Sequence, residues 1–261
     1  MKTNNPNSRF KLSINSRDRV LEIGGGHNPH PRANVVVDKY ILNDGHRSGN
    51  LNILPHQKFV NADGENLPFE DNVFDYVICC HVLEHVENPA KFLKEMTRVA
   101  KRGYIEVPSL LGEYLAPKAS HRWISIEKDN KIVICSKEKL GMQTPTMDAG
   151  DVFLYHLPKN SLAYKALIKT HGNLLTLRYE WENEIDFEID PETTTLPLTE
   201  SGRWLPEMIR QTFPERSIKK EILGFSKALW EVGTEYLKNR MKGKERTQTD
   251  TKIGLGIPIS S

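Results

Sequence analysis

Residues 20–38 read VLEIGGGHNPHPRANVVVD, and they hold the clearest local pattern in the chain. The first four residues are mostly apolar and run into Gly24, Gly25 and Gly26, which is typical of a buried strand that ends in a sharp turn. Residues 34–38 predict a second buried strand, which carries the carboxylate of Asp38 to its C-terminal end. Ligands of open α/β sheets bind at that end, where an acid can hold the two hydroxyls of a ribose. The pattern therefore predicts a nucleotide-type ligand.

The residues after the glycines separate two kinds of ligand. A dinucleotide site needs Gly-x-Gly-x-x-Gly at the start of a helix, because the helix end holds a pyrophosphate. Here Pro29 and Pro31 interrupt the segment where that helix would run, and only eleven residues separate Gly26 from Asp38. S-adenosylmethionine carries ribose and adenine but no pyrophosphate, so it loses little from a curtailed helix. A tight turn with no ligand is the structural alternative for the three glycines.

Composition and charge exclude several classes of protein. The chain has 261 residues, enough for one large domain with appendages or for two small domains, and its formal net charge is only +2. We therefore expect neither nucleic acid nor an anionic membrane as the main partner. The polar start is unlike a secretory signal, no apolar run approaches the ~20 residues of a membrane span, and three cysteines form no disulfide or zinc pattern. We expect no metal site and a cytoplasmic location.

Strand and helix patterns alternate through the first part of the chain. After a polar tail over residues 1–16, strands are expected at 20–23, 34–38, 58–63, 75–80 and 104–107, with a loop over 39–56. Asn88 and Pro89 predict the start of a helix that Gly103 ends, with apolar residues recurring on one face. Such alternation favours a parallel, doubly wound sheet.

The later residues depart from this alternation. Residues 110–158 predict an insert containing a hairpin, with strands at 123–126 and 132–135. A helix at 160–171 and a second hairpin over 175–189 follow. Beyond them, residues 191–241 predict a C-terminal extension or lid with an amphipathic helix from residue 222, whose apolar stripe includes Leu229 and Trp230. Residues 242–261 are expected to be a flexible tail.

Several motifs in this order resemble class I S-adenosylmethionine-dependent methyltransferases, of the branch called methyltransferase type 11. The likeness covers residues 17–109, and its motifs are LEIGGG at 21–26, VD at 37–38, DGENLPF at 63–69, FDYV at 74–77 and HVLEHV at 81–86. The resemblance implies a Rossmann-like, seven-stranded sheet that is mostly parallel with an antiparallel last strand, in a domain over 17–190. It also implies that the helix and hairpin over 160–189 supply the last two, antiparallel strands.

The resemblance further implies a set of cofactor-binding residues. Glu22 and the turn of Gly24, Gly25 and Gly26 would lie against the amino acid end of S-adenosylmethionine, and Asp38 would bind the ribose hydroxyls. Asp63 and the Gly64 N–H would face the adenine, while the backbone near Cys80 and His81 would face the methionine part. Leu67 and Phe69 fit either the adenine pocket or the core. The loop Asn28-Pro29-His30-Pro31 departs from the family, which has a helix there.

Methyl transfer mainly requires that the acceptor is positioned and water excluded. The candidates for a general base are His81, His85 and His121, although each could be a packing or capping residue, His85 at the start of a helix. In the insert, His121, Arg122 and Trp123 are candidate substrate-binding residues, since Arg122 could bind an anionic group and Trp123 could stack on a ring. A surface hairpin anchored by Trp123 is the structural alternative.

The sequence thus predicts a methyltransferase that acts on a small-molecule or glycan-type acceptor. A non-catalytic scaffold with the same fold is one alternative, because cofactor-binding residues do not by themselves commit a protein to a reaction. A nicotinamide-dependent oxidoreductase is the other, and the missing third glycine counts against it. The pair Cys79 and Cys80 is expected to be small core residues.

Overall fold

The fold is described from a computed structural model, which describes residues 1–4, 6, 8–41, 50–142, 148–192 and 204–253. The chain divides into two compact units. The first comprises residues 1–155 and 171–214, and the second comprises residues 156–170 and 215–261. The expected flexible tail overlaps the second unit, and its residues 254–261 lie outside the described part.

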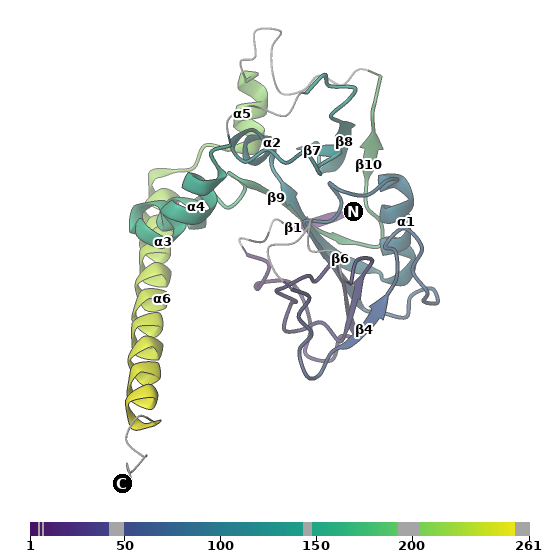
Figure 1. The fold of residues 1–261 in the computed structure, drawn as a ribbon. Coiled ribbons are helices and arrows are strands. Elements are labelled where there is room, and N and C mark those ends of the chain that lie inside the picture. The colour runs from purple at the N-terminus through teal and green to yellow at the C-terminus, as the bar shows by residue number, and fades with distance from the viewer. Residues whose placement is uncertain (5, 7, 42–49, 143–147, 193–203, 254–261) are drawn as a thin grey trace. The chain divides into compact units, whose positions relative to one another are not determined.

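A seven-stranded sheet forms the centre of the first unit (Figure 1). Its strands, in spatial order, are β1 (Lys2–Asn4), β9 (Thr176–Glu182), β6 (Arg102–Pro108), β5 (Tyr76–Cys80), β2 (Val20–Ile23), β3 (Val35–Asp38) and β4 (Lys58–Asn61). Strand β9 pairs antiparallel with both β6 and β1, so β1 runs in the same direction as the five parallel strands. The expected mostly parallel, Rossmann-like sheet is confirmed.

A three-stranded sheet packs beside the main one. Strands β7 (Trp123–Lys128) and β8 (Lys131–Ser136) form the antiparallel hairpin that the insert predicted. Strand β10 (Phe187–Ile189) pairs parallel with β8. The expectation that residues 160–189 supply both last strands of the main sheet is therefore wrong for β10. This strand pairs with β8 of the insert and not with a strand of the main sheet. The chain's own strand β1 takes the edge position instead.

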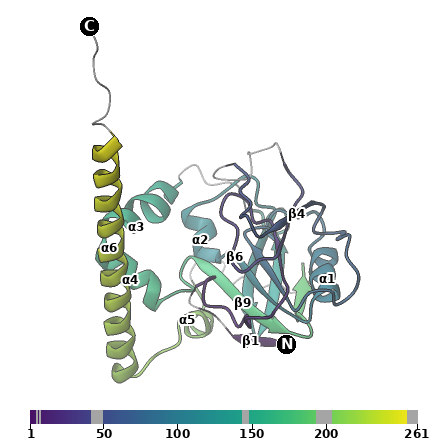
Figure 2. The same cartoon turned by 90° about the horizontal axis from the view of Figure 1, so that it is seen from below.

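Helix α1 (Pro89–Val99) covers one face of the main sheet (Figure 2). Asn88 caps it by accepting a hydrogen bond from the Lys91 N–H at 3.0 Å, and Pro89 stands in its first turn, as predicted. Its fully buried Phe92 and Met96 share one apolar core with β5 and with residues of the three-stranded sheet. This core fixes the strand ends on which the site is built.

The N-terminal segment covers the opposite face of the sheet. Leu12 and Ile14 pack against a second apolar cluster that includes Tyr76 and Tyr104. The Ser13 N–H donates to Glu180 Oε1 at 2.7 Å, and Arg102 Nη1 donates to the Ser13 carbonyl at 2.9 Å. Residues predicted to be a polar tail therefore supply β1 and cover this face of the sheet. They are held there because their polar atoms bond to the buried carboxylate of Glu180, to Arg102 and to the edge of β9.

The remaining helices are short, apart from the last. In the first unit lie α2 (Leu110–Leu115) and α5 (Pro206–Thr212), and the π-helix η1 (Asp151–His156) ends at the first residue of the second unit. In the second unit lie α3 (Leu157–Asn160), α4 (Leu162–Thr170) and α6 (Ile218–Ile253).

Helix α6 is longer at both ends than the sequence pattern predicted. It contacts α4 within the second unit, where Lys169 Nζ lies 3.6 Å from Glu231 Oε2. Ala228 and Val232 are buried, whereas Leu229 and Trp230 of the predicted apolar stripe are exposed. Helix-favouring Lys, Glu, Gln and Arg carry it into the expected flexible tail. No described helix has the length and apolar composition of a bilayer span.

Candidate functional site

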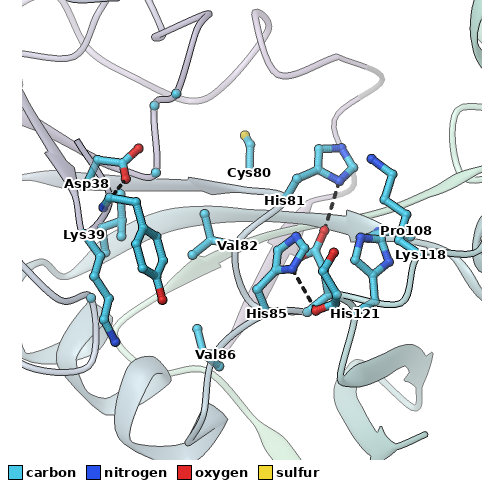
Figure 3. Close-up of a pocket in the computed structure, with 18 of the residues that line it drawn as sticks. Asp38, Lys39, Cys80, His81, Val82, His85, Val86, Pro108, Lys118 and His121 are labelled. Atoms are coloured by element: carbon cyan, nitrogen blue, oxygen red, sulfur yellow. Dashed lines mark hydrogen bonds and ion pairs between the residues drawn. The ribbon is translucent and has the colours of Figure 1, made fainter. Parts of the chain in front are cut away.

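A cavity of about 690 Å³ opens at the C-terminal ends of β2, β3 and β5. Its wall includes most of the residues that the sequence singled out, and Asp38 and His121 lie on opposite sides of it (Figure 3). The cavity-lining residues among the predicted ones are Gly24, Gly25, Gly26, Asp38, Asp63, Gly64, Cys80, His81, His85, His121 and Arg122. Parallel strands bring these residues together because their C-terminal ends share one sheet edge.

The glycine turn begins directly at the end of β2. Gly24 has a φ of +72°, which glycine adopts without steric cost, and its N–H donates to the Val37 carbonyl at 2.7 Å. A Cβ on Gly24 would lie 2.2 Å from Val82 Cγ2. No helix follows in residues 25–34, in agreement with the prolines. The turn therefore leaves bare backbone at the cavity wall but offers no helix end to a pyrophosphate.

Asp38 ends β3 at the cavity. Its Oδ1 accepts a hydrogen bond from the Tyr40 N–H at 2.9 Å, and its backbone carbonyl accepts one from Asn61 Nδ2 at 2.8 Å. These contacts hold the backbone that carries the carboxylate. The strand-end position is the one predicted for an acid that binds a ribose.

Asp63 lies on the same side of the cavity but is already paired. Its Oδ2 lies 2.8 Å from Lys39 Nζ, and its Oδ1 accepts from the Glu65 N–H at 2.9 Å. Burial opposes ionisation, but these partners lower the pKa of Asp63 below its ordinary value. A carboxylate 37% exposed in this way can still receive a further hydrogen bond.

Gly64, Leu67 and Phe69 have packing roles. A Cβ on Gly64 would lie 2.4 Å from Phe92 Cε2, so α1 requires a glycine there. Leu67 is buried in the main core, and Phe69 packs edge-on against Phe74 with ring centroids 5.0 Å apart. Of the two interpretations for Leu67 and Phe69, the structure supports the core.

Glu22 lies behind the glycine turn rather than on the cavity wall. It is 1% exposed, its Oε2 accepts from the His30 N–H at 2.5 Å, and its Oε1 lies 3.2 Å from Arg9 Nη2. Burial raises the pKa of Glu22 to about 7. Arg9 lines the cavity, whereas Glu22 does not. Glu22 therefore affects the cavity only by positioning Arg9 and the His30 loop.

Cys80 ends β5 at the cavity, and His81 follows it. The Cys80 and Cys79 thiols are free and buried, and burial raises the pKa of both, as expected for core residues. The half-exposed His81 has a φ of +55°, and its Nδ1 lies 3.2 Å from Glu84 Oε1. Burial opposes the charged ring, but Glu106 and Glu84 raise the pKa of His81 to about 9. Both carboxylates therefore favour the charged form of the His81 ring.

His85 and His121 form a pair on the far side of the cavity. Their rings meet edge to face with centroids 4.7 Å apart. His85 Nδ1 lies 3.0 Å from the Ser120 carbonyl oxygen, and His121 Nδ1 lies 2.5 Å from Glu113 Oε2. His85 belongs to the turn before α1, not to the start of the helix, because the helix begins at Pro89.

Arg122 and Trp123 follow His121 into β7 but point to different surroundings. Arg122 lines the cavity, and its N–H donates to the Glu84 carbonyl at 2.8 Å. Trp123 is absent from the described cavity wall, packs against the main core and donates from Nε1 to the Val86 carbonyl at 2.8 Å. The contacts of Trp123 are those of the anchored hairpin, and its substrate role is without a contact to support it.

The sequence patterns did not single out Glu113, Arg9 or Lys118 as residues of this region. Glu113 on α2 holds His121 and forms an ion pair with Lys137, and both partners lower its pKa against the effect of burial. Arg9 and Lys118 line the cavity. The only sequence signal for Glu113 is that it is an acidic residue eight positions before His121. Arg9 and Lys118 lie in segments without a pattern.

Part of the cavity wall lies in a segment that is similar to known proteins. Residues 37–105 match the model of a family described as a methyltransferase domain. This part of the chain is similar to methyltransferase domains. The matched residues run from the end of β3, which bears Asp38, to the middle of β6, and they include both Asp63 and the turn with Glu84 and His85.

The proteins that the chain is similar to include an O-methyltransferase and a C-methyltransferase. The chain is 29% identical over 129 residues to a malonyl-[acyl-carrier protein] O-methyltransferase of Marinomonas sp., covering 46% of this chain and 47% of that protein. It is 33% identical over 92 residues to the ubiquinone/menaquinone biosynthesis C-methyltransferase UbiE of Rickettsia prowazekii, covering 35% of each. The chain thus spans less than half the length of these relatives.

Among solved structures, the YcgJ protein of Bacillus subtilis is 21% identical, with a TM-score of 0.31, and covers 42% of this chain and 56% of that chain.

Proposed function

We propose that this chain binds S-adenosylmethionine in the cavity and transfers its methyl group to a small-molecule or glycan-type acceptor. The observation that carries the proposal is the set of residues that line one cavity. The bare glycine turn, the strand-end carboxylate of Asp38, His121 and Arg122 all line this cavity. Figure 3 shows Asp38 and His121 on opposite sides of it. A cofactor and an acceptor must both reach one such space if a group is to pass between them.

The glycine turn and Asp38 fit this cofactor. A strand-end carboxylate can accept hydrogen bonds from both ribose hydroxyls. The turn at Gly24 keeps side chains away from the wall, and a Cβ there has no room. The lack of a helix after the turn suits a ligand without pyrophosphate, which counts against a nicotinamide-dependent oxidoreductase.

The chain's own residues mainly position groups and exclude water. When bound, S-adenosylmethionine supplies a methyl group that its sulfonium has already activated. Arg122 can hold an anionic or polar group of the acceptor. His81 is a poor general base, because Glu106 and Glu84 favour its charged form. We assign no catalytic base.

The proposal is tested by methyl transfer from S-adenosylmethionine labelled on its methyl group to a panel of hydroxylated, aminated and glycosidic acceptors. We expect transfer by the wild-type chain, loss of transfer in Asp38→Asn, and no change in Asp129→Asn, whose exposed carboxylate lies in the β7–β8 turn. Cofactor binding without transfer to any acceptor would favour the non-catalytic scaffold. Equal transfer by all three proteins would contradict the role of Asp38.

A further inference from the structure

Three potential metal ligands converge on the far side of the cavity. Glu84 and His85 lie in the turn after β5, and His121 comes from the insert, close to His85 (Figure 3). One carboxylate oxygen and one ring nitrogen of each histidine all lie within 4.8 Å of one another. Ligands of a tetrahedral zinc ion, each about 2.1 Å from the metal, are roughly 3.4 Å apart. Small side-chain rotations would close the difference.

The hydrogen bonds of the two histidines orient them as metal ligands. The Ser120 carbonyl can only accept, so His85 Nδ1 carries the proton and His85 Nε2 carries the lone pair. Glu113 Oε2 likewise takes the proton of His121 Nδ1 and leaves the lone pair on Nε2. Metal-binding histidines usually donate their second ring N–H to a carboxylate or a backbone carbonyl in this way.

Glu84 supplies the independent observation. The residue is only 2% exposed, and its Oε1 lies 3.2 Å from His81 Nδ1. Its Oε2 is buried and has no hydrogen-bond partner in the described part of the chain. A buried carboxylate oxygen without a partner is costly and calls for an explanation, such as an ion.

We propose that Glu84, His85 and His121 bind a divalent first-row transition cation, of which Zn²⁺ is the test case. Two imidazole nitrogens and one carboxylate oxygen form a donor set typical of such ions, and it leaves coordination positions open. We expected no metal site because the cysteines form no zinc pattern, but this donor set contains no cysteine. The histidines are then ligands rather than candidate bases.

One consequence rests on the proposed function. The ligand cluster lines the same cavity as Asp38, so an open coordination position would bind an oxygen of the acceptor. Cation binding itself does not depend on that function. It is therefore measured without S-adenosylmethionine, so that either proposal can fail alone.

The alternative is a polar cluster that only ties the insert to the turn before α1. To separate the two, the full chain without a polyhistidine tag is stripped with a chelator and titrated with Co²⁺, whose visible spectrum reports its ligands. Zn²⁺ then competes for the site. The variants are Glu84→Gln, His85→Gln and His121→Gln, and the matched control is His56→Gln. His56 is exposed and lies outside the cluster, bonded to the Pro31 carbonyl.

We expect one equivalent of Co²⁺ to bind, Zn²⁺ to displace it, and affinity to fall about tenfold or more in the cluster variants but not in His56→Gln. Circular dichroism identifies any variant that fails to fold. His121→Gln carries the greatest risk of this, because it also removes the bond between His121 and Glu113. His85→Gln and Glu84→Gln then carry the test. The proposal would be overturned if the folded wild-type chain did not bind Co²⁺, or if His85→Gln and Glu84→Gln bound it with wild-type affinity.

Discussion

The backbone N–H of His30 donates a hydrogen bond of 2.5 Å to Oε2 of Glu22. This bond ties the proline-rich loop to the strand that precedes the glycine turn, where related proteins are expected to have a helix. The His30 ring is also held, because its Nε2 lies 2.9 Å from the Arg9 carbonyl and its Nδ1 accepts from the Arg32 N–H at 3.1 Å. Two buried titratable groups thus shape the wall behind the cavity.

Replacement of Glu22 by Gln is expected to change how stability depends on pH. Folded Glu22 keeps its proton up to about pH 7, whereas the unfolded chain releases it near 4.5. Folding therefore loses free energy as the pH rises through this window, by about 3 kcal/mol at most. Denaturant unfolding of both proteins should show wild type losing stability relative to Glu22→Gln between about pH 5 and pH 8. Parallel profiles would show that Glu22 is not protonated in the fold.

His30→Gln is expected to act at the acidic end. The ring nitrogens bond one acceptor and one donor, which requires the neutral imidazole. Burial lowers the pKa of His30 from 6.5 to about 4, so the unfolded chain binds a proton that the folded chain does not. Wild type should lose about 3 kcal/mol relative to His30→Gln as the pH falls through this window. The same unfolding series measures it, and a constant difference between the proteins would be the contrary result.

Gly24→Ala is expected to distort the turn. Both Gly24 and Gly141 have a positive φ, but a Cβ on Gly24 would meet Val82 at 2.2 Å, whereas a Cβ on Gly141 would meet nothing within 4 Å. Gly141→Ala should therefore cost about 1 kcal/mol of strain, and Gly24→Ala about 1–3 kcal/mol more. Thermal unfolding of the two variants measures this difference. Equal losses would show that Val82 moves away freely.

Arg122→Ala is expected to separate acceptor binding from cofactor binding. Its exposed side chain lines the acceptor side of the cavity, and the bond from its N–H to the Glu84 carbonyl survives the change. Affinity for S-adenosylmethionine should be unchanged, while methyl transfer falls about tenfold or more. Arg17→Ala, on an exposed residue outside the cavity wall, is the control. Equal loss of both activities in Arg122→Ala would mean that Arg122 has a structural role.

Much of the central fold could be predicted because it depends on local patterns. The buried strands at Val20–Ile23, Val35–Asp38 and Tyr76–Cys80 have continuous apolar runs, and α1 has a cap, a proline and a regular apolar face. Asp38 could be placed at the cavity for the same reason, since a strand pattern also fixes where the strand ends.

The rest depends on contacts between segments far apart in the chain. Nothing in Lys2–Asn4 marks an edge strand, because its partner is β9. The apolar alternation of Phe187–Ile189 predicts a strand but cannot show that it pairs with β8. Likewise, neither Glu113 nor Glu84 stands out until the insert brings His121 beside His85. The cofactor side was therefore more accessible to prediction than the cluster opposite it.

The central claim is that the cavity binds S-adenosylmethionine through Asp38. It is tested most directly by calorimetric titration of the wild-type chain and Asp38→Ala with S-adenosylmethionine, S-adenosylhomocysteine and NAD. We predict micromolar binding of the first two ligands to wild type, about 8 kcal/mol, no binding of NAD, and loss of binding in a folded Asp38→Ala. Binding of NAD alone, or unchanged affinity in Asp38→Ala, would contradict the account.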